Sequence, residues 1–99
     1  MVHAGTERGA HWAERAAQSF AQRLKGGIEV IYWKQSGETM SVWSVLAGYD
    51  RVAEDRVFEA EAGVLAAHPE LRFDFRILYR HGRTLDDVRP SGARRADCS

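Results

Sequence analysis

Apolar residues recur every three or four positions in two stretches of the chain, a spacing that indicates amphipathic helices. Residues 7–25 form the first predicted helix, and Gly26-Gly27 is a clear stop signal after it. Residues 50–67 form the second, with Asp50 as its N-cap and Pro69 just beyond its end. The apolar stripe of the first helix is Ala13, Ala16, Ala17, Phe20 and Leu24.

Three other stretches show the patterns of strands. Residues 28–34 and 39–47 are rich in β-branched and aromatic residues, and the short turn between them predicts an antiparallel hairpin. Residues 71–79 alternate between apolar and polar positions, which predicts a third strand. Because a helix connects the second and third strands, we expect these two to be parallel and joined by a right-handed crossover. The third strand directs Phe73, Phe75, Ile77 and Tyr79 to the core and Arg72, Asp74 and Arg76 outward.

The resulting order, α-β-β-α-β, predicts an α/β (α+β) fold. We expect a two-layer sandwich in which two helices cover a three-stranded mixed sheet. Residues 6–79 form this single domain, and residues 1–5 are expected to be disordered. Residues 80–99 are rich in Arg, Asp, Gly and Ser, which predicts a largely disordered tail with at most a short ordered piece at residues 85–88.

The length of 99 residues leaves room for one small domain, so the core is thin. A three-stranded sheet also leaves both of its edges open to pairing with another chain. These two features together favour a homodimer or a complex with a protein partner.

The 14 basic and 14 acidic side chains balance, but they are unevenly distributed. Residues 1–27 hold four basic and two acidic side chains, residues 28–79 hold five and nine, and residues 80–99 hold five and three. This acidic middle disfavours nucleic acid as a partner, although it does not exclude it. Pairing between the basic ends of one copy and the acidic middle of another is favoured instead.

No apolar run approaches the about 20 residues of a membrane-spanning helix, so no membrane association is expected. The N-terminus lacks the apolar core of a signal peptide, and the single cysteine, Cys98, cannot form an internal disulfide. We therefore expect a cytoplasmic protein. The preference for Arg over Lys, together with frequent Ala, is typical of a GC-rich bacterial genome.

Glu54, Glu61 and His68 lie seven residues apart and therefore line up along one side of the second helix. One interpretation is a carboxylate–imidazole site for proton transfer or a metal. Neighbours two turns apart are about 10.5 Å from each other, which is too far to share one ion. We therefore predict no metal site, and expect this line to be a polar seam that contacts a partner. Apolar residues flank it on both sides, with Ala53, Val57, Ala60 and Val64 on one flank and Phe58 and Leu65 on the other.

Motifs of catalysis and cofactor binding are missing from the chain. There is no P-loop, no GxGxxG and no GxSxG, and the four histidines show no ligand spacing. We therefore predict no catalytic residue and no cofactor, and expect a protein that is not an enzyme.

Trp33 and Trp43 come from adjacent predicted strands and are candidates for an interaction surface. Together with Arg72 and Arg76 they could form a platform on which single-stranded bases stack. The alternative is that they lie beneath a helix or in a dimer interface.

Two segments carry a resemblance to a known family. Residues 42–50, VWSVLAGYD, run from the second strand into the loop before the helix, and residues 69–78, PELRFDFRIL, form the third strand with Asp74 at its centre. In these segments and in element order over residues 10–79, the chain resembles the minimal nucleotidyltransferase domains of the DNA polymerase β-like superfamily. Three carboxylates in that family bind two metal ions.

The resemblance implies that Asp74 corresponds to the third carboxylate, a candidate for binding a nucleotide or a metal. The positions of the family's Asp-x-Asp motif fall near Ser41 and Trp43, which are not carboxylates. The resemblance therefore implies a degenerate, non-catalytic member that could still bind a nucleotide.

The sequence thus favours a small non-catalytic α/β protein that acts through protein association, most simply as a dimer. A degenerate nucleotide-binding domain and a nucleic-acid-binding module that uses the aromatic sheet and the Arg-rich tail remain as alternatives.

Overall fold

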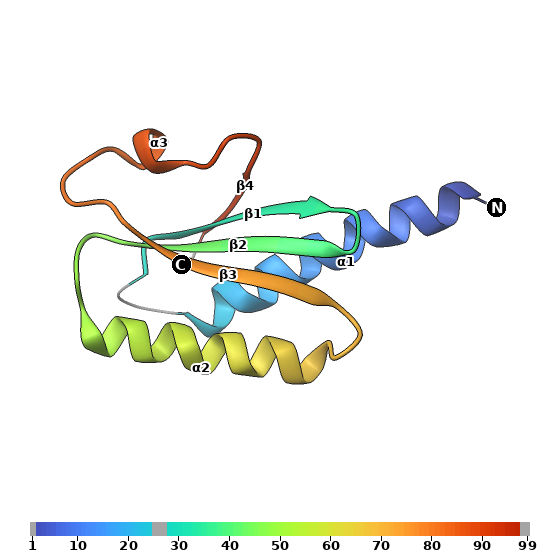
Figure 1. Cartoon of the computed structure of the whole chain (residues 1–99), viewed down its shortest axis with the longest axis horizontal. Coiled ribbons are helices and arrows are strands. Elements are labelled where there is room, and N and C mark those ends of the chain that lie inside the picture. The colour runs from blue at the N-terminus through green and yellow to red at the C-terminus, as the bar shows by residue number, and fades with distance from the viewer. Residues whose placement is uncertain (1, 25–27, 98–99) are drawn as a thin grey trace.

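The computed structural model describes residues 2–24 and 28–97, and a mixed four-stranded sheet lies at its centre (Figure 1). The strands are ordered β3-β2-β1-β4, with β1 antiparallel to both of its neighbours and β2 parallel to β3. The predicted hairpin and the parallel crossover pair are therefore confirmed. The predicted number of strands, three, is wrong, because a fourth strand comes from the C-terminal segment. The strand bounds are β1 Val30–Ser36, β2 Thr39–Leu46, β3 Arg72–Tyr79 and β4 Arg94–Asp97.

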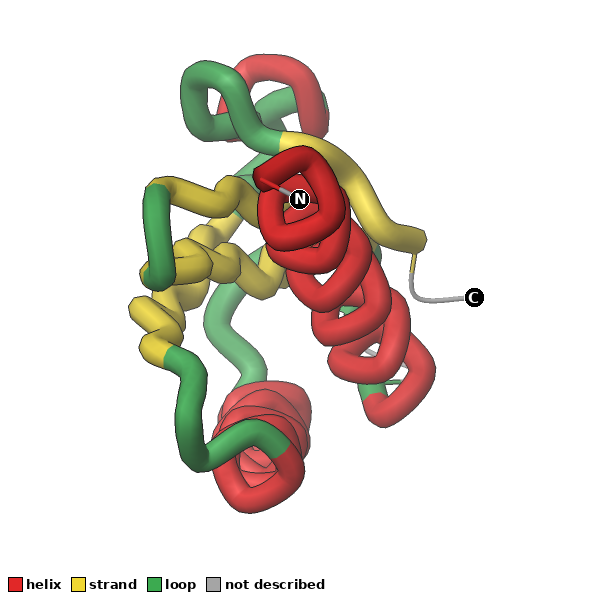
Figure 2. Tube along the Cα trace, turned by 90° about the vertical axis from the view of Figure 1, so that its right-hand side faces the viewer, coloured by secondary structure: helices red, strands yellow, loops and turns green. Residues whose placement is uncertain are grey.

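Two long helices, α1 (Val2–Arg23) and α2 (Arg51–Ala67), lie on the same face of the sheet (Figure 2). The side chain of Asp50 accepts a hydrogen bond of 3.1 Å from the Ala53 amide, which confirms Asp50 as the N-cap of α2. Because α1 begins at Val2, residues 2–5 are helical, and the expectation of a disordered N-terminus is wrong for them. The predicted helix stop, Gly26-Gly27, lies outside the described residues.

The main core fills the space between the two helices and the sheet. Ala16 and Phe20 of α1 and Val57 of α2 are buried there against Ile31 and Val42 of the sheet. All four apolar residues of β3 that the alternation directed inward pack against this core, as predicted, but each is only half-buried because β3 is the outermost strand.

A second, smaller core covers the opposite face of the sheet. It consists of Val30, Tyr32, Val45 and Ala93, and a short helix, α3 (Leu85–Val88), packs against it. The hydroxyl of Tyr32 donates a hydrogen bond of 3.1 Å to the carbonyl of Leu85. The C-terminal segment therefore covers apolar residues of the sheet that would otherwise face water.

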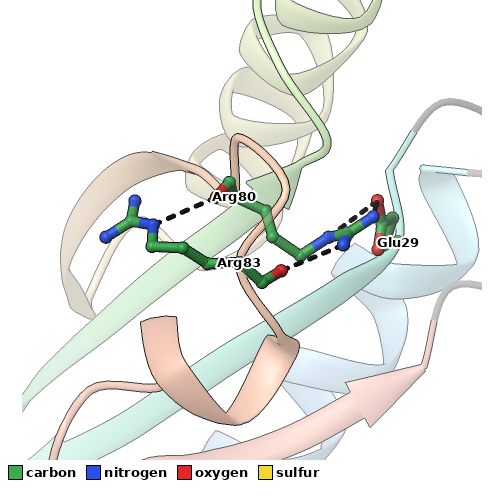
Figure 3. Close-up of polar contacts among 3 residues, drawn as sticks. All are labelled: Glu29, Arg80 and Arg83. Atoms are coloured by element: carbon green, nitrogen blue, oxygen red, sulfur yellow. Dashed lines mark hydrogen bonds and ion pairs between the residues drawn. The ribbon is translucent and has the colours of Figure 1, made fainter.

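Residues 80–97 thus form part of the fold, and the expectation of a largely disordered tail is wrong for them. Thr84 and Asp87 form a reciprocal capping box that starts α3. The guanidinium of Arg80 donates to Glu29 Oε1 at 2.8 Å and to the carbonyl of Arg83 at 3.0 Å, which attaches the segment to the start of β1 (Figure 3). The described residues form three helices, where two were predicted.

Within residues 2–24 and 28–97, no helix has both the length and the apolar character needed to cross a membrane.

Candidate interaction surface

The outer edge of β3 offers backbone groups that the sheet does not use. The amide of Arg80 donates to the carbonyl of Leu46 in β2 at 2.8 Å, so the N–H of Arg80 points toward β2. Backbone groups alternate in direction along a strand, and the β2–β3 register continues from Thr39↔Arg72 to Leu46↔Tyr79 without a bulge. The even-numbered residues of β3 therefore bond to β2, and the odd-numbered residues point outward.

One side-chain hydrogen bond limits the open edge at its end. The carbonyl of Tyr79 accepts from Arg83 Nη2 at 2.8 Å. In the described part of the chain, no hydrogen bond reaches the outward N–H and C=O groups of Phe73, Phe75 and Ile77. Three residues thus leave three donors and three acceptors open at the edge of the sheet.

Aromatic side chains extend the main core out to this edge. The rings of Phe73 and Phe75 stack with centroids 5.3 Å apart, and Phe75 stacks on Phe20 of α1 at 5.5 Å. Trp12 meets Phe73 edge-on at 6.4 Å. Because these β3 rings are only half-buried, apolar surface lies directly beside the open backbone.

The predicted line of Glu54, Glu61 and His68 lies on the side of α2 that faces β3. The hydroxyl of Tyr79 hydrogen-bonds to Glu54, and the His68 ring lies 6.5 Å from the ring of Phe73. All three residues of the line are half-buried. The structure therefore shows a seam between α2 and the outer strand.

The two apolar flanks of this seam differ in burial. Ala53, Val57, Ala60 and Val64 are buried. Phe58 and Leu65 are 53% and 45% exposed. Helix α1 lies on the side of α2 that carries Gly63, opposite to the flank of Phe58 and Leu65. A Cβ added at Gly63 would come within 2.7 Å of the guanidinium of Arg23 in α1. Phe58 and Leu65 therefore lie beyond the seam, on the side of α2 nearer the β3 edge.

The seam is partly shielded from water, and the pKa values of two of its ionisable groups are raised. Burial raises the pKa of Glu61 above the ordinary value of 4.5. The pKa of Tyr79 is also raised, first by its hydrogen bond to Glu54 and then by burial and the nearby negative charge. Glu54 Oε2 and Ser44 Oγ are buried without a hydrogen-bond partner among the described residues.

Asp74, the candidate for a nucleotide or a metal, lies on the other face of the sheet. Its side chain is partly exposed and pairs with Arg76 at 3.4 Å. The register places it beside Ser41 of β2, so no carboxylate stands next to it on that strand. Among the described residues, no three His, Cys, Asp or Glu side chains gather where a metal ion could be held.

Trp33 and Trp43 do not form one platform. The register pairs Trp33 with Val42 and Tyr32 with Trp43, so the two tryptophans point to opposite faces of the sheet. Trp33 is 5% exposed in the main core, with the Arg94 guanidinium 5.5 Å from its ring centroid. Trp43 is half-buried beside the smaller core. The predicted joint stacking surface is therefore wrong, because the register of the hairpin places the two rings on opposite faces of the sheet.

Sequence reasoning missed the attachment of the C-terminal segment, although a signal for it was present. Leu85 and Val88 are spaced as neighbours on one helical turn, and Thr84 with Asp87 matches the spacing of a capping box. The ion pair between Glu29 and Arg80 joins residues far apart in the chain, and no local sequence pattern predicts it. Cys98 lies outside the described residues.

Comparison of the chain with family models, with curated proteins and with solved structures finds no match.

Proposed function

We propose that this chain is a non-enzymatic cytoplasmic protein that works by association with a second copy of itself. Its docking surface consists of the outward backbone groups of Phe73, Phe75 and Ile77 together with the side chains of Phe58 and Leu65. We call it the β3–α2 surface.

The open backbone of β3 is the observation that carries this proposal. An unpaired strand edge is a template for pairing with another chain, and proteins usually protect long edges with charges, prolines or a covering segment. On β3 only the end at Tyr79 is covered, by Arg83. The remaining edge lies beside half-buried aromatic rings and two exposed apolar residues of α2, an arrangement typical of an interface.

The small size of the fold adds a second argument. A chain of 99 residues buries a smaller share of its surface than larger domains do, so joining two cores stabilises both copies. Association through β3 would also complete the shielding of the seam that Glu54, Glu61 and His68 form.

The test is the oligomeric state of the wild type and of two matched variants, measured by sedimentation equilibrium. We expect the wild type to be a dimer, and Phe58→Glu combined with Leu65→Glu to be a monomer. Val52→Glu is the control, because Val52 is 64% exposed on α2 but lies outside the β3–α2 surface. A monomeric wild type would overturn the proposal, as would a doubly substituted variant that dimerises like the wild type.

A second candidate function rests on the part of the other sheet face that the C-terminal segment does not bury. Half-buried Trp43 lies there in register with Arg76, and Lys34 and Arg72 are exposed on the same face. An aromatic ring among cations suits a single-stranded nucleic acid. Binding of a single-stranded oligonucleotide that weakens with salt, and is lost in Trp43→Ala, would support this function. The resemblance to nucleotidyltransferases remains a prediction.

A further inference from the structure

The charges and open backbone groups of β3 together select one geometry for the dimer. We propose that two copies pair β3 against β3 in antiparallel fashion about a two-fold axis at Phe75, so that Asp74 of each copy faces the partner's Arg76. This inference rests on the proposed function and specifies it to the level of residue pairs.

The open backbone groups match this register completely. An axis at Phe75 places Phe73 opposite the partner's Ile77 and Phe75 opposite its own counterpart. These odd-numbered residues direct N–H and C=O outward, so each opposing pair can exchange two hydrogen bonds. Every open donor and acceptor of the three residues is then satisfied, and none is left over.

The charges on the opposite face of the sheet match the same register. Asp74 and Arg76 lie on one face and alternate in sign, with Arg72 preceding them. With Phe75 on the axis, Asp74 faces the partner's Arg76, and the pair occurs twice by symmetry. These positions lie between the hydrogen-bonded pairs, where opposing side chains come closest, so opposite charges there stabilise the pairing.

Registers whose axis is shifted by one residue lose the pairing of opposite charges. An axis at Asp74 places two aspartates opposite each other and Arg72 opposite the partner's Arg76. An axis at Arg76 places two arginines opposite each other, and like charges directly opposite are destabilising.

Registers shifted by two residues lose backbone bonds, and an axis at Ile77 also places Arg76 opposite the partner's uncharged Leu78. An axis at Phe73 places Ile77 opposite the partner's Pro69, which has no N–H to donate. An axis at Ile77 places Phe75 opposite the partner's Tyr79, whose carbonyl is already bonded by Arg83. The register centred on Phe75 is the one that satisfies both the charges and the backbone.

The helices are compatible with this geometry. A two-fold axis perpendicular to the sheet keeps α2 of both copies on the same face. His68 lies level with Phe73 and Glu54 level with Tyr79, so the axis at Phe75 lies level with the part of α2 between Phe58 and Leu65. The exposed flanks of the two α2 helices then face each other across the axis, and the two sheets join into one.

The test uses two charge reversals, alone and mixed. In Asp74→Arg the partner's Arg76 meets an arginine, and in Arg76→Asp the partner's Asp74 meets an aspartate. We expect each variant to dimerise about tenfold more weakly than the wild type. In an equimolar mixture, each cross-chain contact again joins opposite charges, so heterodimers should form with nearly the affinity of the wild type.

The mixture separates contacts between chains from contacts within one. Asp74 and Arg76 also pair within a chain, at 3.4 Å, and this internal pair remains like-charged in both variants when they are mixed. Native mass spectrometry distinguishes the heterodimer from both homodimers by mass, and Glu38→Arg in the exposed hairpin turn is the control for a charge change elsewhere. The far-ultraviolet circular dichroism spectrum of each variant verifies that it is folded.

The outcomes distinguish this inference from the proposed function. Recovery of the heterodimer supports the register. Unchanged dimerisation of both single variants, or a mixture without recovery, overturns the register while association itself stands. A wild type that is monomeric overturns both.

Discussion

The two outer strands of the sheet contrast in how they meet their surroundings. Strand β3 is eight residues long, and its open backbone lies beside exposed apolar residues of α2. Strand β4 is four residues long, and the Arg94 guanidinium lies over the ring of Trp33 at its start. An edge strand of short length pairs poorly with other chains, and β4 is half as long as β3. One edge of this sheet is therefore protected, and the other is available.

The largest effect is expected from removing the protected edge. Deletion of residues 84–99 removes β4 and α3 and exposes the second core, including Val30 and Val45. Loss of the apolar contacts of Leu85, Val88, Ala93 and Ala96 should cost about 5 kcal/mol, comparable to the entire stability of a small domain. We expect the truncated chain to be unfolded in urea titrations followed by circular dichroism. A cooperative transition like that of the full chain would show that β4 is dispensable.

The next effect should appear at the available edge and only in association. Phe58→Glu with Leu65→Glu should weaken dimerisation about 100-fold, because two charges enter an apolar contact. The free energy of unfolding of the monomer should change by less than about 1 kcal/mol, because both side chains are substantially exposed. Equilibrium unfolding at low protein concentration separates the two quantities. A large loss of monomer stability would mean that these residues belong to the core.

A smaller effect is expected where the C-terminal segment attaches to β1. Glu29→Gln weakens the ion pair with Arg80, which has a distance of 2.8 Å and is partly shielded from water. The free energy of unfolding should fall by about 1 kcal/mol. Dimerisation should be unaffected, because Glu29 precedes β1, which β2 separates from β3. Chemical denaturation measures the first quantity and sedimentation the second. Weaker dimerisation in this variant would place Glu29 in the interface.

The smallest effect concerns the pH dependence of the seam. Because burial raises the pKa of Glu61, the folded state holds its proton more tightly than the unfolded state does. Wild-type stability therefore decreases as pH rises from the ordinary value of 4.5 through the raised pKa. Glu61→Gln should melt slightly higher than the wild type at pH 7, and this difference should vanish below the ordinary value. A variant that melts lower at pH 7 would contradict the stated cause.

The contrast between the edges also shows how far the sequence determines the fold. Periodicity identified α1, α2 and β3, because each has an apolar face of regular spacing. The β-branched and aromatic residues of β1 and β2, with the short turn between them, identified the hairpin. It missed β4, since residues 94–97 contain one alanine among charged residues and gain their order from pairing with β1. A strand whose order comes from pairing with its neighbour need not show an apolar pattern in its own sequence.

The candidate surface also has one part that the sequence determines and one part that it does not. The line of Glu54, Glu61 and His68 and its two flanks could be predicted, because helical spacing alone fixes them. The outward direction of the backbone at Phe75 depends on which side β2 lies, and no residue type encodes that. The opposite orientation of Trp33 and Trp43 likewise depends on the register of the hairpin.

Amide hydrogen exchange at the two edges of the sheet, measured over a range of protein concentrations, tests association through β3. We expect the amides of Phe73, Phe75 and Ile77 to exchange freely in dilute protein and to become protected as the concentration rises to about 1 mM, while the protection of β4 does not change. Free exchange of these three amides at the highest concentration would contradict it.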